Sequence, residues 1–104
     1  MNLSFENQAA LITGAGSGIG LATARAFAQA GAAVALADLD QVAVTAAAEE
    51  LTAAGQEAIA IPCDVVSDSN VARTVAQTVT AFGRLDFAYN NAGIHAPVAE
   101  TADA

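Results

Sequence analysis

The sequence has no lysine, and its three basic residues face 11 acidic ones, which gives a formal net charge of −8 at pH 7. All three bases are arginines. A surface that binds nucleic acid needs a basic patch to displace counterions from phosphates. The same shortage of positive charge disfavours an anionic membrane surface. We therefore expect neither nucleic acid nor membrane among the partners of this chain.

Cysteine is almost absent as well. Cys63 is the single cysteine, so no disulfide can form within the chain, and a reducing compartment fits this composition. One cysteine and one histidine cannot supply the ligands of a structural zinc site, so we expect no metal site. The first residues lack the basic start of a signal peptide, and no apolar run is long enough to span a membrane. These observations favour a cytoplasmic protein.

Alanine is the residue that the sequence has in excess, and alanines outnumber leucine, isoleucine, valine and phenylalanine combined. The chain is 104 residues long and 55% hydrophobic, which argues against disorder. Alanine favours helix and close packing but buries little area per residue. We expect residues 1–104 to form one small domain, or a part of a larger one, with a thin core.

Short apolar runs alternate with longer stretches of helical character. Glycines at Gly31, Gly55 and Gly83 mark where the helical stretches end. Asp40, and Ser67 or Asp68, stand where a helix N-cap is expected. The pattern predicts four strands at 9–13, 33–38, 57–63 and 85–90, and three helices at 18–30, 41–54 and 68–82. In the last helix, one face is expected to carry Val71, Val75, Val79 and Phe82.

This alternation is typical of an α/β fold with a parallel sheet and right-handed crossovers. Pro62 cannot donate a hydrogen bond to a neighbouring strand, so the third strand belongs at an edge. The Rossmann-type doubly wound sheet with strand order 3-2-1-4 places it there. We therefore predict this four-stranded half of a dinucleotide-binding domain, with residues 94–104 as a loop or an unfinished element.

Residues 13–20 read TGAGSGIG and lie between the first strand and the first helix. Backbone N–H groups at a helix N-terminus, together with the helix dipole, attract anions. Side chains would block a close approach, which explains the density of glycine. The expected ligand is the diphosphate of a dinucleotide.

The spacing of this loop is T-G-x-x-x-G-x-G, from Thr13 to Gly20, rather than G-x-G-x-x-G. It resembles the N-terminal half of the short-chain dehydrogenases/reductases. Three further motifs support the resemblance: Asp38 after the second strand, Asp64-Val65 after the third, and N-N-A-G at 90–93 after the fourth. Together they cover nearly the whole chain.

The resemblance implies a role for each motif. Asp38 would bind the adenosine ribose hydroxyls. Asp64 and Val65 would lie at the adenine ring, and N-N-A-G would steady the sheet and line the cofactor with backbone groups. The candidate cofactor-binding residues are Gly14, Ser17, Gly18, Ile19, Gly20, Asp38, Leu39, Asp64, Val65, Asn91, Ala92 and Gly93.

Asp38 also bears on the choice of cofactor. A carboxylate repels the 2′-phosphate of NADP in a partly dry cleft. NADP-binding relatives usually carry a base in the glycine loop or just after the second strand, where this chain has Ser17 and Leu39. The sequence therefore favours NAD over NADP.

The catalytic groups of the family are a serine and a Tyr-x-x-x-Lys pair, in which the lysine lowers the tyrosine pKa. Here the single tyrosine, Tyr89, is followed four residues later by Gly93, and lysine is absent. We therefore assign no catalytic residue, and we expect a truncated dehydrogenase that is inactive alone. The resemblance implies an alcohol or carbonyl substrate and a homo-oligomeric full-length protein. The fourth strand, with Phe87 and Tyr89, would form a bare apolar edge that makes the isolated chain marginal or prone to oligomerise.

Two other functions stay open at this point. One is a non-catalytic NAD-binding module or inactive homologue, which fits the intact loop and the missing catalytic groups. The other is an S-adenosylmethionine-dependent methyltransferase, which Gly14, Gly16 and Gly18 with Asp38 fit loosely but which the N-N-A-G motif argues against. Taken singly, the two aspartates could also be plain helix caps or solvated turn residues.

Overall fold

The computed structural model describes residues 5–64 and 67–90. Within these ranges all of the predicted elements are present, in the predicted order. The strands are β1 Ala9–Thr13, β2 Ala33–Asp38, β3 Ala58–Pro62 and β4 Phe87–Asn90. The helices are α1 Gly18–Gln29, α2 Gln41–Ala53 and α3 Asp68–Phe82.

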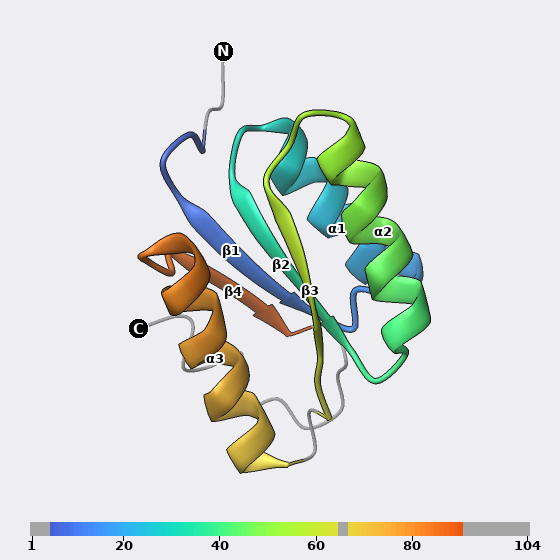
Figure 1. Cartoon of the computed structure of the whole chain (residues 1–104), viewed down its shortest axis with the longest axis vertical. Coiled ribbons are helices and arrows are strands. Elements are labelled where there is room, and N and C mark those ends of the chain that lie inside the picture. The colour runs from blue at the N-terminus through green and yellow to red at the C-terminus, as the bar shows by residue number, and fades with distance from the viewer. Residues whose placement is uncertain (1–4, 65–66, 91–104) are drawn as a thin grey trace.

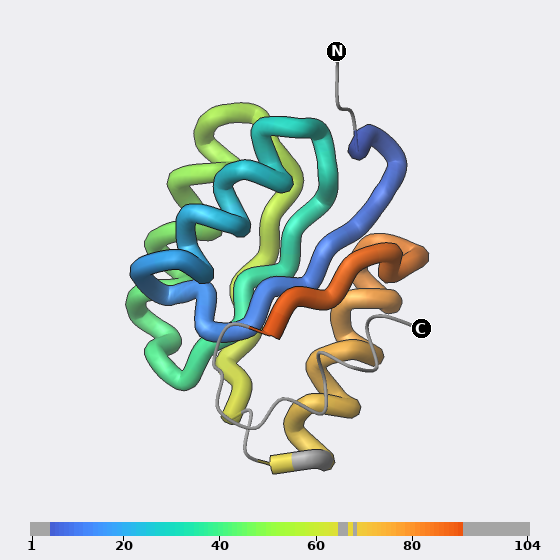
Figure 2. The backbone as a smooth tube through the Cα atoms, turned by 180° about the vertical axis from the view of Figure 1, so that it is seen from behind, coloured from blue at the N-terminus to red at the C-terminus, as the bar shows by residue number. Residues whose placement is uncertain are grey.

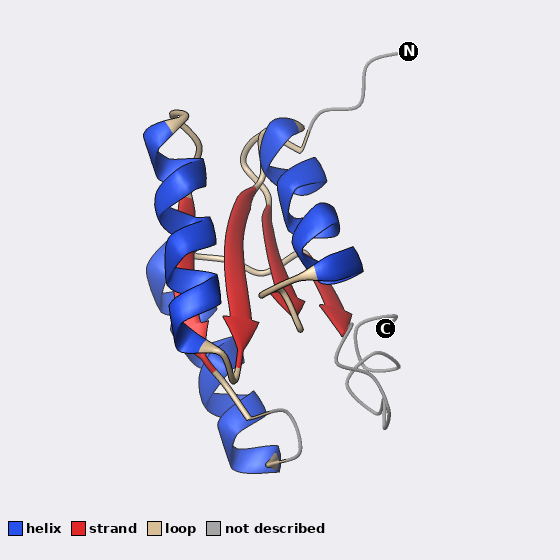
Figure 3. Cartoon of the chain, turned by 90° about the vertical axis from the view of Figure 1, so that its right-hand side faces the viewer, coloured by secondary structure: helices blue, strands red, loops and turns tan. Residues whose placement is uncertain are grey.

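The four strands form one parallel sheet in the order β3-β2-β1-β4, which confirms the predicted topology. Their arrows all point the same way in Figure 3. Pro62 is the last residue of the edge strand β3, opposite Asp38, as expected for a residue that cannot donate to a neighbour. In Figure 2, β4 runs beside β1 although most of the chain separates them in sequence.

Alternate residues of the strands face two separate cores. Ala10, Ile12, Val34 and Leu36 pack with α1 and α2, and we call this side the two-helix face. Leu11, Ala35, Ala37 and Ile61 point to the other side, the one-helix face, where α3 lies. Figure 1 shows α3 on the opposite side of the sheet from α1 and α2. Both faces of the central strands are therefore covered, as continuous apolar strands require.

The apolar residues expected on one face of α3 are not equally buried. Val79 is 40% exposed, whereas Thr74 and Thr78, which the sequence did not single out, are 2% and 0% exposed. Each threonine hydroxyl donates to the backbone carbonyl four residues earlier, at 2.8 Å, so the helix itself satisfies these buried polar groups. Val75 and Phe82 do pack against the one-helix face.

Strand β4 begins later than predicted, at Phe87 rather than at residue 85. The reason lies in Asp86, whose side-chain carboxylate accepts the Ala9 amide at 2.8 Å while its own amide donates to the Ala9 carbonyl at 2.9 Å. The Asp86 carboxylate therefore takes the place of a strand carbonyl as the acceptor for the Ala9 amide. The same carboxylate takes two hydrogen bonds from Arg84, each 2.8 Å long.

Phe87 is not the bare edge residue that the sequence predicted. It packs with Phe5 and Phe27 in a cluster whose ring centroids lie 5.2–5.3 Å apart. The three rings extend the two-helix face over β4 and join the residues before β1 to α1. Tyr89, on the same strand, is 41% exposed.

Candidate nucleotide-binding site

The carboxyl ends of the four parallel strands bring the predicted motifs to one edge of the sheet. β1 leads into the glycine loop, β2 ends at Asp38, β3 leads to Asp64, and β4 ends at Asn90. In open α/β sheets, ligands bind outside the carboxyl ends of the strands, where the chain order reverses. Here the reversal lies between β1 and β4, next to the glycine loop that follows β1.

The glycine loop needs glycine at two positions for its backbone. Gly14 and Gly18 have φ angles of 64° and 60°, in the left-handed region that other residues rarely adopt. A Cβ added to Gly18 would meet no atom within 4 Å, so the space above this residue is open. The Ala15 amide donates to the Ala37 carbonyl at 3.1 Å and ties the loop to β2. The loop is thus held at its base and open at its tip.

The N-terminus of α1 differs from those of the other two helices. Asp40 caps α2 by accepting the Ala43 amide, and Ser67 caps α3 by accepting the Asn70 amide, as the sequence predicted. Ser17 occupies the N-cap position of α1, but its side chain makes no cap hydrogen bond, and the first turn carries no acidic residue. Within the described residues, the N-cap side chain therefore does not satisfy the first amides of α1.

Asp38 lies beside this uncapped end, and both of its carboxylate oxygens have backbone donors. Oδ2 accepts the Gly16 amide at 2.9 Å, and Oδ1 accepts the Asp40 amide at 3.0 Å. The Asp38 carbonyl accepts the Cys63 amide at 3.0 Å, which ties β2 to the end of β3. A carboxylate has about four acceptor positions, so each oxygen keeps one for a further donor.

Three apolar side chains are exposed near these strand ends. Ile19 lies in the first turn of α1, Leu39 follows Asp38, and Val42 lies in the first turn of α2, with exposures of 68%, 71% and 80%. Ile19 and Leu39 are among the predicted cofactor-binding residues, whereas Val42 was not predicted. Large aliphatic side chains exposed beside polar donors are typical of ligand sites, in which most of the lining is apolar.

The sequence analysis missed the contact that joins β1 to β4. The buried Thr13 hydroxyl donates to Asn90 Oδ1 at 2.7 Å and lies 3.3 Å from the Tyr89 carbonyl. Thr13 opens the loop motif and Asn90 opens N-N-A-G, so the two motifs are bound to each other. The threonine directly before the first glycine of the loop was the sequence feature that could have indicated this contact. Val65, Asn91, Ala92 and Gly93 lie outside the described residues.

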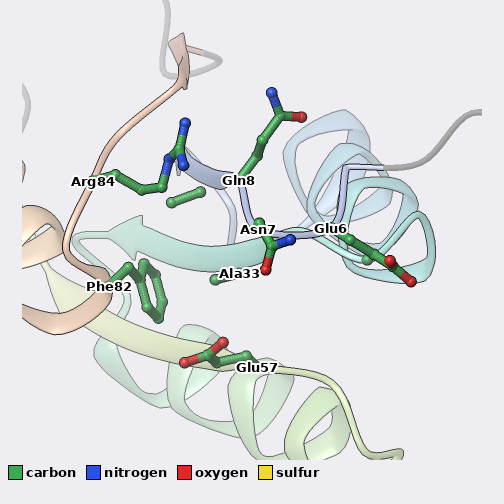
Figure 4. A pocket seen from close by; sticks show the side chains of 9 residues that line it. Glu6, Asn7, Gln8, Ala33, Glu57, Phe82 and Arg84 are labelled. Atoms are coloured by element: carbon green, nitrogen blue, oxygen red, sulfur yellow. The ribbon is translucent and has the colours of Figure 1, made fainter.

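A pocket of about 570 Å³ lies at the opposite end of the sheet, where the strands begin (Figure 4). Glu6 and Glu57 contribute carboxylates to its lining, and Arg84 is already paired with Asp86. The helices end at this side, so their dipoles add negative charge. These features repel phosphate, and the pocket does not compete with the glycine loop as a nucleotide site.

Comparison with known proteins agrees with this arrangement. The sequence profile of the short chain dehydrogenase family matches residues 8–104. The chain belongs to this family. Its relatives include the uncharacterized oxidoreductase YxjF of Bacillus subtilis (strain 168), which is 47% identical over 95 residues, covering 89% of this chain and 37% of YxjF. Cyclohexanol dehydrogenase of Acinetobacter sp. (strain SE19) is 39% identical over 103 residues, covering 99% of this chain and 41% of that enzyme.

Solved structures of short chain dehydrogenases have the same fold. A 7α-hydroxysteroid dehydrogenase complexed with NADH and 7-oxo glycochenodeoxycholic acid superposes with a TM-score of 0.81 and 33% identity, covering 84% of this chain and 34% of that one. A short chain dehydrogenase/reductase from Burkholderia phymatum in complex with NAD gives 0.79 and 36%, with coverages of 82% and 30%. The chain thus spans well under half the length of the family members that it matches. In the described residues, none of the three helices is long and apolar enough to cross a membrane.

Proposed function

We propose that this chain is the NAD-binding half of a short-chain dehydrogenase that interconverts an alcohol and a carbonyl compound. The main observation that supports this proposal is the N-terminus of α1, which Ser17 does not cap and which lies beside the Asp38 carboxylate. An anion-binding helix end and a ribose-binding acid at adjacent strand ends are the two contacts that an adenine dinucleotide needs. The complexes of two structural neighbours with NADH and NAD support the same class of cofactor.

The described residues fit this group. The open space above Gly18 leaves the backbone free to approach a diphosphate, and Ser17 does not cap the first amides of α1. Asp38 keeps acceptor positions for the ribose hydroxyls, and the exposed Ile19 and Leu39 offer apolar contact. When bound, NAD supplies the hydride-transfer chemistry, and the protein binds and orients it.

We propose NAD rather than NADP as the cofactor. The 2′-phosphate of NADP would lie against the Asp38 carboxylate, and like charges repel more strongly where water is partly excluded. Ser17 and Leu39 carry no positive charge that would offset this repulsion. The remaining proposed contacts, from Gly14, Gly20, Asp64, Val65 and the N-N-A-G segment, do not discriminate between the two cofactors.

The tyrosine–lysine pair that the family resemblance implies for turnover is absent from these 104 residues. The sequence holds no lysine, and its single tyrosine, Tyr89, lies in β4 and is 41% exposed. We propose that the chain by itself binds the cofactor without catalysing the reaction. The same observation keeps a second function open, a non-catalytic NAD-binding module. We also propose a small-molecule alcohol as substrate, a cytoplasmic location and a homo-oligomeric full-length protein.

Calorimetric titration with NAD, NADP and S-adenosylmethionine tests the proposal. We expect NAD to bind more tightly than NADP, and S-adenosylmethionine to give no heat of binding. Asp38→Asn removes the charge and should weaken NAD binding roughly tenfold, the size of one charged hydrogen bond. Asp40→Asn is the matched control, because it removes a charge two residues away while asparagine can still cap α2. A folded chain that binds none of the three ligands would refute the proposal.

A further inference from the structure

We propose that Gly16 is a specificity-determining residue: its amide fixes the Asp38 carboxylate, and its lack of a side chain keeps that carboxylate where it favours NAD over NADP. This inference rests on the proposed function, since it concerns the same cofactor site. Gly16 was not among the residues that the sequence predicted to bind cofactor. Its part emerges only from the contact with Asp38.

The first step concerns the backbone of Gly16. Gly14 and Gly18 on either side have positive φ angles, but Gly16 is not among the residues with positive φ. A side chain at Gly16 would therefore not strain the backbone. The reason for glycine at this position must be the space around it rather than its conformation.

The second step concerns that space. A Cβ built on Gly16 would lie 2.9 Å from Asp38 Oδ2 and 3.3 Å from Asp38 Cγ, with the Ala43 Cβ at 3.2 Å. A real Cβ does not approach another atom within 3 Å, so something must move. The most mobile of these atoms belong to the Asp38 carboxylate, because the Ala43 Cβ is attached directly to the backbone of α2. A methyl group at residue 16 would rotate the carboxylate away from its present position.

The third step links this position to the ligand. The Gly16 and Asp40 amides hold one carboxylate oxygen each and so fix the plane of the group. A fixed carboxylate can accept hydrogen bonds from two neighbouring ribose hydroxyls, and it meets a 2′-phosphate with full repulsion. A rotated carboxylate loses acceptor geometry toward NAD and also relieves part of the repulsion toward NADP. The two affinities should therefore change unequally.

The variant Gly16→Ala tests this proposal in the 104-residue chain by calorimetry. We expect NAD affinity to fall roughly tenfold, as for the loss of one charged hydrogen bond, while NADP affinity stays the same or rises. The preference of the chain for NAD over NADP, measured as the ratio of the two affinities, should therefore become smaller. Circular dichroism should show a thermal unfolding midpoint close to that of the wild type, because only the end of the half-buried Asp38 side chain has to move.

Two matched variants separate the carboxylate from plain crowding. In Gly16→Ala/Ala43→Gly, the neighbouring methyl is removed but the clash with Asp38 stays, so the narrowed ratio should persist. In an Asp38→Ala background, Gly16→Ala should leave the ratio unchanged, since the group through which it acts is gone. Full recovery in the Ala43→Gly double variant would overturn the proposal.

An NMR measurement on the free chain provides a test that does not depend on the folding of a Gly16 variant. The Gly16 amide proton should resonate downfield in the wild type, and should shift upfield and exchange faster with solvent in Asp38→Ala. An unchanged signal would overturn the proposal. The proposed function and the proposed role of Gly16 would be refuted by different results. No NAD binding by folded wild-type chain refutes the proposed function, whereas NAD binding with an unchanged ratio in Gly16→Ala refutes the role of Gly16 alone.

Discussion

The two faces of the sheet are buried in different ways. On the two-helix face, aliphatic side chains such as Leu36 and Val44 pack among alanines of α1 and α2. On the one-helix face, α3 presents Thr74 and Thr78 to the strands, and Val75 and Phe82 are only partly buried. Alanine lets a helix approach the sheet closely, so even small residues exclude water. The comparison teaches that burial alone does not define an apolar core, because the residues that α3 buries most completely on the second face are threonines.

The largest expected effect separates the two faces directly. Leu36 and Leu11 lie on opposite faces and are 0% and 1% exposed. We expect Leu36→Ala to lower the free energy of unfolding by about 3–4 kcal/mol and Leu11→Ala by about 2–3 kcal/mol, because a single helix can move to fill part of the cavity. Urea denaturation of both variants measures the difference. A loss from Leu11→Ala equal to or above that from Leu36→Ala would contradict the comparison.

A smaller effect concerns the connection from α3 to β4. The hydrogen bonds from Arg84, and next the Ala9 amide, hold the pKa of Asp86 below its usual value. A lowered folded-state pKa adds stability above the unfolded pKa of about 4, and this stability is lost as pH falls through the folded value. Asp86→Asn should therefore be less stable than wild type at pH 7, and the difference in stability should shrink as the pH falls below the unfolded pKa of about 4.

The control for this pH dependence is Arg84→Gln. It removes the larger cause of the lowered Asp86 pKa but keeps the Ala9 amide. The loss of stability of Arg84→Gln as the pH falls should be intermediate between the losses of wild type and Asp86→Asn. Thermal unfolding at a series of pH values measures these losses. Identical profiles for Asp86→Asn and wild type would show that the ion pair does not stabilise this end of the sheet.

The smallest expected effect is a gain. Thr78 is fully buried, and its hydroxyl bonds only within α3. Thr78→Val exchanges that hydroxyl for a methyl group against the one-helix face, and should raise the free energy of unfolding by about 0.5 kcal/mol. Thr80→Val, on the exposed side of the same helix, is the control and should change little. Destabilisation by Thr78→Val would mean that the hydroxyl has a structural role that the packing does not reveal.

Sequence patterns were enough to predict the strand order, because alternation, the glycines after each helix and Pro62 all indicate the same topology. These patterns also predicted that the glycine loop and Asp38 lie together at the carboxyl ends of the strands. They could not reveal that the Gly16 amide meets Asp38 or that Thr13 meets Asn90, since spacing does not tell which donor reaches which acceptor. The buried threonines of α3 were missed for a similar reason. The sequence pattern indicated an apolar face of α3, but residue type does not show that the helix satisfies its own threonine hydroxyls.

The pairing of β4 with β1 has a consequence for the order in which the chain folds. Asp86 and Ala9 are joined across 77 residues, whereas β1 and β2 are joined by a single helical crossover. Bringing distant segments together costs more chain entropy and slows folding. On the ribosome, β1 must also wait for β4 to be synthesised. We therefore expect β1, β2 and β3 to assemble first and β4 to join them last, so that one side of β1 stays unpaired for most of the chain's synthesis.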